Sequence, residues 1–508
     1  MIEKKRCIKD TQDKYDQAEG RIYECIFCLL VVCIPIIGQA VIANHGIGAE
    51  KIHMGMWISI LLVTFIFVSD IIRDTGDQKE DKILRWLLLL GCIMRIGYTF
   101  YNGVFSRVHD VWYYDDYTQN SKASYLMWLI ERGKLPDTYE GQLYHQPFSY
   151  LFTAGVCKIL QLLTNDRNIY FVGSIGGKLG SCMASCMTML FSLKLCRELE
   201  LKAENKILAM WFIAFLPGMY LAAGRIGEDA FSCLFAVMEI YTALKWFHDS
   251  SFRNTVYVAV SFGLGLQTNL SCILPMGLLV ILVLEKMIKN HEAIKKYIGQ
   301  TAIFAGIAAP LGLWFYIRNA IRFGIPFTYI NEQEVGNILW TGEHSLQERF
   351  APINLKNIIV SPYAISYEDY NLSTYFLKSE IFGEFSFEIG KIIPYTLLAI
   401  NLLVTILLIF HIIRWIVKGK KEHDEWALLG MFVFYLLFIC YSYYKEPFGC
   451  SMDARYFLIV PVLKIILTGK FAESLDPASV PGKGYAAVME TAMLLFGTAS
   501  IVMFCTIS

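Results

Sequence analysis

Long apolar runs recur along the chain and constrain its fold more than any other feature of the sequence. A helix that crosses the hydrocarbon core of a bilayer needs about 20 largely apolar residues. Of the 508 residues, 55% are hydrophobic and 18% are charged, whereas soluble domains are about one quarter charged. The sequence therefore predicts an all-α polytopic membrane protein and excludes a soluble globular domain.

Thirteen membrane spans are predicted from these runs. They are Ile22–Ala43, Met54–Ile72, Ile83–Phe105, Ile169–Cys196, Lys206–Ala222, Ala230–Phe247, Val256–Leu270, Cys272–Ile288, Gln300–Ile317, Lys391–Val417, Trp426–Tyr444, Ala454–Thr468 and Tyr485–Ile507. The apolar run Phe148–Leu163 is interpreted as a helix lying at the membrane interface. With that interpretation the short lysine- and arginine-rich loops fall on the side of the N-terminus, and such loops mark the cytoplasm.

This topology divides the chain into six parts. They are a cytoplasmic tail (1–21), the first three spans (22–105), an outer loop with the interfacial helix (106–168), further spans (169–317), an outer loop or cap (318–390) and the C-terminal spans (391–508). The polar segments that lie between spans then gather on the outer face. The inner loops are short and basic, as plain connectors are.

The first outer loop carries the densest group of acidic and aromatic residues. Asp110, Asp115 and Asp116 fall within seven residues, and Trp112 and three tyrosines surround them. A carboxylate at the membrane surface suits the general base of a transfer to a hydroxyl group, and a second carboxylate would raise its pKa or orient the acceptor. The acidic pair is also compatible with a divalent metal, which prefers oxygen ligands. The plainer interpretation is a solvated loop with an aromatic belt.

Arginines at the outer ends of other spans are candidates for binding a lipid phosphate. Arg455 lies at the mouth of the twelfth predicted span and is the first candidate, because a guanidinium binds phosphate bidentately; the alternative is an arginine that snorkels to the interface. Arg225 and Asp229 are predicted to line the same cavity, or else Asp229 only caps a helix. Arg318 and Arg322 are further candidates for the phosphate. His145 is a candidate for binding a headgroup or sugar, or else it is a histidine of the interfacial belt.

These residues occur in a familiar order. The segments are His109-Asp110-Val111, Asp115-Asp116, Gly133-Lys-Leu-Pro136, Tyr144-His145-Gln-Pro147, Gly224-Arg225-Ile-Gly-Glu-Asp229-Ala, Arg318-Asn-Ala-Ile-Arg-Phe-Gly-Ile-Pro326 and Asp453-Ala-Arg455-Tyr456. Over roughly 83–468 the chain resembles the GT-C superfamily of integral-membrane glycosyltransferases, in the branch of bacterial relatives of protein O-mannosyltransferases and of the aminoarabinose transferase of lipid A. It departs from that pattern in having Gln-Pro in place of a proline pair and two additional spans before Ile83.

The resemblance implies a GT-C-like bundle with short interfacial helices in its outer loops, in the plasma membrane of a bacterium. It implies inverting transfer of a sugar from a polyprenyl-phosphate donor at the outer face, with no required cofactor and no required metal. Asp110 would be the base, with Asp115 or Asp116 as the alternative or the support. Arg455 and Arg225 would bind the donor phosphate. The cavity residues would be His109, Tyr144, His145, Pro147, Asp229, Asp453 and Tyr456.

Partners and alternatives follow from the same observations. Membrane lipids and the polyprenyl-phosphate sugar are the expected partners, and the acceptor is left open between a protein, a lipid and a cell-wall polymer. The formal net charge of zero argues against nucleic acid. Arg95, Lys178 and Glu239 lie within predicted spans, and charged residues there keep a lipid-linked sugar flippase or another transporter as the alternative. A scaffold without chemistry is the third hypothesis.

Overall fold

The computed structural model describes residues 2–73, 79–108, 110–111, 120–331, 333–365, 368–418 and 423–507. His109, Asp115 and Asp116 lie outside the described residues. In the described part the regular elements are helices, and Trp340 and Phe448 form an isolated antiparallel bridge. The chain is thus an all-helical polytopic membrane protein, as its apolar runs predict.

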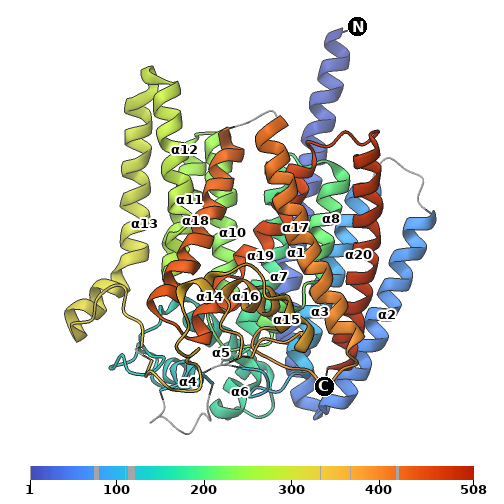
Figure 1. The fold of residues 1–508 in the computed structure, drawn as a ribbon. Helices are drawn as coiled ribbons and strands as arrows, with labels where there is room; N and C mark the ends of the chain where they lie inside the picture. Colours follow the sequence, from blue (N-terminus) through green and yellow to red (C-terminus); the bar gives the residue numbers. More distant parts are fainter. Residues whose placement is uncertain are drawn as a thin grey trace.

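The helices form a bundle with a layer of short helices at one end, which we call the loop end (Figure 1). The helices of the bundle are α1 (Ile2–His45), α2 (Ala49–Arg73), α3 (Lys79–Tyr101), α7 (Leu179–Glu198), α8 (Ala203–Phe215), α9 (Pro217–Ala223), α10 (Asp229–His248), α11 (Phe252–Leu266), α12 (Met276–Lys289), α13 (Ile294–Phe323), α17 (Ile392–Lys418), α18 (His423–Lys445), α19 (Ile459–Ala472) and α20 (Val480–Thr506). The remaining helical elements are α4 (Lys122–Arg132), α5 (Phe148–Leu163), α6 (Ile169–Gly176), η2 (Leu270–Ile273), η3 (His291–Ala293), α14 (Leu346–Phe350), α15 (Leu355–Val360), α16 (Leu372–Phe382), η4 (Gly449–Met452) and η5 (Ala454–Phe457).

The described part of the chain has fewer candidate spans than the thirteen predicted. Ten helical stretches are long and apolar enough to cross a membrane, and α8 with α9 makes an eleventh if this pair, bent by 49°, is one span. α11 and α19 form where spans are predicted, but they have 15 and 14 residues, short of the roughly 20 that a span needs. The apolar runs there include turn residues: α11 ends at Leu266 and α19 begins only at Ile459.

Two further predicted segments can be compared with the structure: the cytoplasmic tail and the interfacial helix. The segment predicted as a cytoplasmic tail continues the first helix, because α1 begins at Ile2, and it extends beyond the bundle at the end opposite the loop end (Figure 1). The predicted interfacial helix is α5, with the same bounds, Phe148–Leu163. At 1.5 Å per residue it is too short to cross the hydrocarbon core.

α7 and α10 form the centre of the bundle, and α2 lies at its edge. Nearly all side chains of α7 are buried, whereas α2 exposes apolar side chains such as Phe65 and Ile72. An exposed apolar helix face costs free energy in water but not in lipid. The edge helices therefore face the hydrocarbon and the central helices supply the packed core.

The bend between α8 and α9 accounts for one buried charge. Pro217 at the start of α9 lacks an N–H group, so the last carbonyls of α8 lose their helical partners. Arg95 donates to two of them, with Nη1 3.1 Å from the Ala214 oxygen and Nη2 2.9 Å from the Ile213 oxygen. Arg95 is therefore a structural cap of a broken helix.

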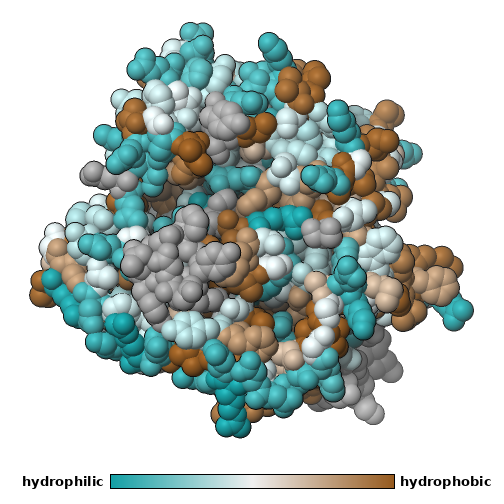
Figure 2. Space-filling model, turned by 90° about the horizontal axis from the view of Figure 1, so that it is seen from below, coloured by the Kyte–Doolittle hydropathy of each residue, from teal (hydrophilic) through white to brown (hydrophobic). Residues whose placement is uncertain are grey.

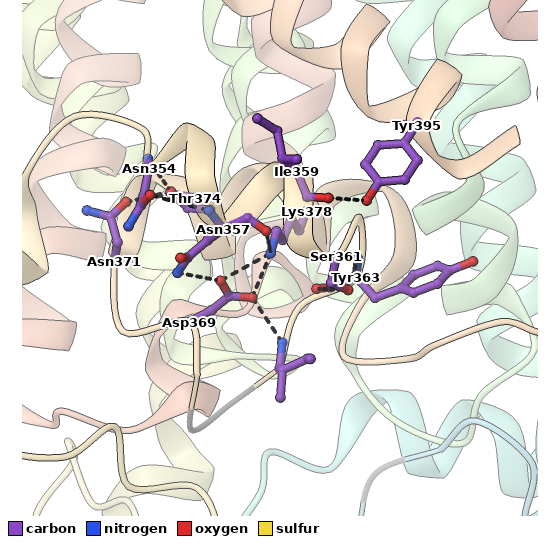
Figure 3. A network of polar contacts seen from close by, with 11 residues as sticks. Asn354, Asn357, Ile359, Ser361, Tyr363, Asp369, Asn371, Thr374, Lys378 and Tyr395 are labelled. Carbon is purple, nitrogen blue, oxygen red and sulfur yellow. Dashed lines mark hydrogen bonds and ion pairs between the residues drawn. The ribbon is translucent and has the colours of Figure 1, made fainter. Parts of the chain in front are cut away.

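The outer segment 318–390 supplies the short helices α14, α15 and α16, with Asp369 at the centre of their polar contacts (Figure 3). Asp369 accepts from Lys378 at 2.8 Å and from the Asn357 amide at 3.1 Å. Lys378 and Asp369 are both buried, and a buried ion pair stabilises only when its remaining hydrogen-bonding groups are satisfied. Here they are, so this network holds the cap together rather than forming a reactive site.

Candidate functional site

Asp110 is the part of the first outer loop's acidic group that the structure describes. Its backbone has φ +55°, a left-handed conformation that aspartate tolerates better than most residues. Its carbonyl oxygen accepts from the Lys122 N–H at 2.9 Å, and its half-buried carboxylate lies within electrostatic range of Lys122, His145 and Tyr456. The loop therefore returns to the start of α4 directly beside Asp110.

A buried ion pair joins the start of α4 to the start of α10. The Lys122 ammonium lies 3.0 Å from Glu228 Oε1, and both side chains are almost inaccessible. Tyr150 of α5 donates to the other Glu228 oxygen at 2.8 Å. Gly227 makes the approach feasible, because its φ is +153° and a Cβ there would lie 3.2 Å from the Lys122 ammonium.

The charges of this pair support one another. Burial by itself would raise the pKa of Glu228, but His145, Lys122 and a hydrogen bond from Tyr150 lower it well below its ordinary range. Burial would likewise lower the pKa of Lys122, yet Glu228 and Asp229 hold it above its ordinary value. Lys122 and Glu228 are thus a fully charged pair at neutral pH.

Two arginines lie beside this pair with donors that are not used. Arg225 stacks on Phe385, with 4.8 Å from its guanidinium carbon to the ring centre. Arg455 Nη2 lies 2.5 Å from the Tyr456 hydroxyl, and its Nε lies 3.3 Å from Asp453 Oδ2. Among the described residues, the buried atoms without a hydrogen-bond partner include Arg225 Nε, Arg455 Nε and Nη1, Asp229 Oδ1 and Asp453 Oδ2.

Unpartnered buried polar atoms occur in several parts of the described chain, and five of them belong to these four residues. Native proteins pair nearly all buried polar groups, and an unpaired one costs about 1–3 kcal/mol. Here two guanidinium groups and two carboxyl groups gather before and at the starts of α10 and α19. Arg455 and Asp453 form an ion pair at 3.3 Å, but none of the five atoms has a hydrogen-bond partner. Such an arrangement can bind a ligand that carries both an anion and hydroxyl groups.

Asp453 is the titratable group of this cluster near neutral pH. Burial, and after it the charge of Glu384, raises its pKa to about 7, while Arg455 and Arg225 act in the opposite direction. The unfolded value is about 3.9. The folded protein therefore favours the neutral form, so Asp453 stabilises the fold below about pH 4, and this contribution is lost as the pH rises through about 7.

Tyr144, His145 and Pro147 form the wall between the first loop and α5. The Tyr144 and His145 rings stack with their centres 4.4 Å apart. His145 Nδ1 lies 3.6 Å from Glu228 Oε1, and burial, together with Lys122, lowers the pKa of this imidazole although Glu228 opposes the shift. Pro147 is the N-cap residue of α5. The motif thus lies against the ion pair of α4 and α10.

Arg318 lies elsewhere at the loop end. Its Nη2 donates to the Pro136 oxygen at 2.6 Å and its Nη1 to Asn319 at 2.7 Å. Its neighbour Arg322 pairs with Asp137 at 2.7 Å. These contacts tie the end of α13 to the first loop, and they do not place Arg318 beside Arg225 and Arg455.

Figure 2 shows the surface of the loop end from below, where hydrophilic and hydrophobic residues alternate. In the described ranges, no group of three or more His, Cys, Asp or Glu side chains could hold a metal ion. The acidic pair at 115 and 116 lies outside those ranges, so its relation to a metal stays a prediction.

Lys122 and Tyr150 are the residues of this cluster that the sequence did not single out. Lys122 follows an acidic loop and begins a helix whose other positions are largely buried. A lysine in such a place needs an anionic partner, which is a usable signal. Its partner Glu228 is 106 residues away in the chain, however, and the sequence there indicates only an ordinary helix cap.

The charges that favoured a transporter have separate explanations in two of three cases. Arg95 caps α8, and Lys178 donates to the Thr99 carbonyl at 2.8 Å and to the Asn102 carbonyl at the end of α3. Glu239 is buried on α10, and neither of its carboxyl oxygens has a hydrogen-bond partner among the described residues. Two of the three groups therefore stabilise helix ends.

No protein-family model and no curated protein sequence matches the chain. Solved structures do match. ArnT from Cupriavidus metallidurans in the apo state is 12% identical, with a TM-score of 0.49 over 84% of this chain and 75% of that one. Its form bound to undecaprenyl phosphate is 11% identical, with a TM-score of 0.46 over the same shares.

Another matching structure is that of the oligosaccharyltransferase AglB from Archaeoglobus fulgidus. The complex with zinc and sulfate is 12% identical, with a TM-score of 0.46 over 84% of this chain. The chain spans 53% of the length of that protein, so a large part of AglB has no counterpart here. The chain thus has structural matches, at low identity, to ArnT and to the oligosaccharyltransferase AglB.

Proposed function

We propose that this protein is a membrane glycosyltransferase that moves a sugar from a polyprenyl-phosphate donor to an acceptor at the loop end of the bundle. One observation carries the proposal: Arg225 and Arg455 are buried at the membrane boundary with unpartnered N–H groups, beside the carboxylates of Asp229 and Asp453. The sequence resemblance to GT-C enzymes points to the same reaction. Asp110 of the first loop lies within electrostatic range of Tyr456, which contacts Arg455.

In this proposal the two guanidinium groups bind the phosphate of the donor lipid. Guanidinium–phosphate pairs are charge-assisted and bidentate, and they strengthen where water is excluded. The unpartnered donors of Arg225 and Arg455 are oriented by Phe385 and Tyr456. The apolar faces of the surrounding helices would accommodate the polyprenyl chain, which lies in the hydrocarbon.

Asp110 is assigned the general base, with Asp115 or Asp116 as the alternative or the support. As the acceptor oxygen forms a bond to the sugar C1, the bond between C1 and the phosphate oxygen breaks, and the configuration at C1 inverts. The acceptor hydroxyl proton passes to the carboxylate, and the negative charge of the leaving phosphate is neutralised by the arginines. No step of this sequence requires a metal ion.

The membrane placement is part of the same proposal. The positive-inside rule puts the N-terminus in the cytoplasm and the loop end on the outer face, and the resemblance favours a bacterial plasma membrane. The acceptor stays open between a protein, a lipid and a cell-wall polymer. Arg318 is given a positioning role in place of a contact with the donor phosphate, because it holds the first loop at Pro136.

Replacing either buried arginine tests the phosphate site. Arg455→Gln and Arg225→Gln are each expected to weaken binding of undecaprenyl phosphate about tenfold to 100-fold, because a hydrogen bond to a charged group contributes about 1.5–3 kcal/mol. Binding would be measured by titration of the purified protein in nanodiscs. Arg322→Gln is the matched control, since Arg322 is an exposed arginine of the same end that pairs with Asp137.

Protein stability is measured alongside affinity for these variants. Asp453, with a pKa of about 7, can take up a proton when Arg455 is removed, so the fold is expected to survive Arg455→Gln. Unchanged affinity in a folded Arg455→Gln protein would contradict the phosphate role and leave Arg455 as an interfacial arginine. Arg455→Lys keeps the charge and is expected to recover part of the affinity.

The affinity for the phosphate is also expected to depend on pH through Asp453. An anion bound by Arg455 raises the pKa of the adjacent carboxyl, so binding takes up a proton and weakens as the pH rises from 6 to 8. A further rise of about one pKa unit gives about a tenfold change in affinity. In Asp453→Asn this dependence is lost. The remaining trend is the opposite one: binding strengthens as the pH rises, because the phosphate loses its second proton. Identical pH profiles for the two proteins would contradict the prediction.

A further inference from the structure

A cavity lies between α12 and α13, closer to the end of the bundle that is opposite the loop end. Its volume is about 320 Å³. The residues that form its wall are Trp246, Val258, Leu279, Val283, Gln300 and Phe304. With the exception of a few hydroxyl and amide groups, the lining is apolar, and none of it belongs to the charged cluster of the loop end.

Helix packing explains why the cavity exists. α13 packs along α11, and α12 packs instead on α10 and α18. α11 and α13 approach closely at Gly263, where a Cβ would lie 2.8 Å from Leu311. α12 and α13 are joined by η3 and form a pair at the edge of the bundle (Figure 1), but they have no such close contact. A wedge between them follows from these unequal contacts.

The wedge opens toward the hydrocarbon and not toward water. Val280 and Leu284 line the cavity and are 49% and 52% exposed. Both lie on α12, within a candidate membrane span. An apolar cavity with an apolar lateral opening in a bilayer favours an alkyl chain, because the chain fills the volume without desolvating a polar group.

A basic rim borders this end of the cavity. Within the segments 245–253 and 285–296 there are six lysines and arginines and three acidic residues, a net charge of +3 from 6 − 3. Lys286 lies next to the lining residue Met287, with its ammonium 4.8 Å from the centre of the Phe247 ring. Lys289 and Lys296 are exposed on either side of the turn that joins α12 to α13.

The wall of the cavity also contains a buried polar atom that has no hydrogen-bond partner among the described residues. Gln300 donates through its amide nitrogen to the Ser250 carbonyl at 2.7 Å. Its amide oxygen is buried and has no hydrogen-bond partner among the described residues. This oxygen can accept from a hydroxyl or an ammonium group of a ligand that carries a polar head above its chain.

We propose that this cavity is a binding site for an anionic phospholipid, with one acyl chain between α12 and α13 and its phosphate on the basic rim. The apolar volume selects the chain, and the lysines select the negative charge. The site lies at the opposite end of the bundle from the proposed sugar transfer and does not depend on it. A neutral lipid would fill the same volume without gaining the electrostatic contribution.

The experiment is a titration of the delipidated, detergent-purified protein with phosphatidylglycerol and with phosphatidylcholine of the same chains, followed by native mass spectrometry. One tightly bound phosphatidylglycerol is expected, held at least about fivefold more tightly than phosphatidylcholine, since each basic residue near an anionic headgroup contributes about fivefold. Equal affinity for the two lipids would overturn the assignment of an anionic lipid.

Two sets of variants separate the cavity from the rim. Val280→Trp fills the opening and is expected to weaken both lipids about tenfold. Ile281→Trp is the control on the same helix, because Ile281 is similarly exposed but does not line the cavity. The combined variant Lys286→Gln, Lys289→Gln, Lys296→Gln is expected to weaken phosphatidylglycerol alone.

Other results would contradict the site. Full phosphatidylglycerol binding by a folded Val280→Trp protein would show that the lipid lies elsewhere on the surface. If Val280→Trp does not fold, the lysine variants decide the question, because they alter two exposed side chains and one half-buried side chain at the end of the bundle. An unchanged preference for phosphatidylglycerol in those variants would then overturn the proposal. The assay contains no sugar donor, so its outcome is independent of transferase activity.

Discussion

Replacing Asp110 by asparagine is expected to lower sugar transfer about 100-fold to 10,000-fold while the protein still folds and binds its donor. The magnitude is that of a lost general base. Asparagine is the suitable replacement because it tolerates the left-handed backbone at this position, φ +55°, as aspartate does. The backbone hydrogen bond from Lys122 to the Asp110 carbonyl is kept as well. Transfer would be followed with a polyprenyl-phosphate sugar in proteoliposomes.

A matched control for this variant is Asp137→Asn. Asp137 is an acidic residue of the same outer loop, exposed and paired with Lys134 and Arg322. It is expected to leave transfer unchanged. Normal transfer by Asp110→Asn would show that Asp110 is not the general base, and Asp115 or Asp116 would become the candidate. Single asparagine variants at these two positions would then show which of them is the base.

Breaking the Lys122–Glu228 pair is expected to have the largest effect on stability. Lys122→Met leaves the Glu228 carboxylate buried without its cation, and removing one partner of a buried pair costs about 3–5 kcal/mol. Glu228 would keep only the hydrogen bond from Tyr150 and the imidazole of His145. Thermal or denaturant unfolding in detergent would measure the loss.

A double-mutant cycle then tests whether the two residues act as a pair. Lys122→Met with Glu228→Gln is expected to lose less than the sum of the single variants, because no unpaired charge remains. Lys134→Met is the control, since Lys134 and Asp137 form a comparable contact on the exposed surface, where ion pairs contribute little. Additive losses in the buried cycle would mean that Lys122 and Glu228 stabilise the protein separately.

The sequence predicted the membrane fold more reliably than the number of spans. Apolar runs such as Ile22–Ala43 can be recognised as membrane spans by their length alone. The helix α5 has the predicted bounds, Phe148–Leu163. The runs over α11 and α19 were misleading because apolar residues continue beyond each helix into turns. Length measures how many apolar residues are contiguous, not where the backbone leaves the helix.

The candidate site was predictable to the extent that its residues occur at span ends. Arg225 and Arg455 each lie four residues before the start of a helix, α10 and α19, so their position near the membrane boundary follows from the chain order. The chain order does not predict that both arginines lie within electrostatic range of Asp229 and Asp453. Arg318 occupies an equally plausible position in the sequence, yet its guanidinium is used by the Pro136 carbonyl and Asn319.

The sequence by itself determined that this protein is a helical membrane protein whose acidic and basic residues gather between spans. Helix length and side-chain polarity are local properties, so they can be read along the chain. Only the tertiary structure decided which charges pair with one another. Lys122 meets Glu228 across 106 residues, Arg95 satisfies the carbonyls of a broken helix, and Arg225 and Arg455 retain unpartnered donors. Pairing depends on distances between helices, and these distances are fixed by packing.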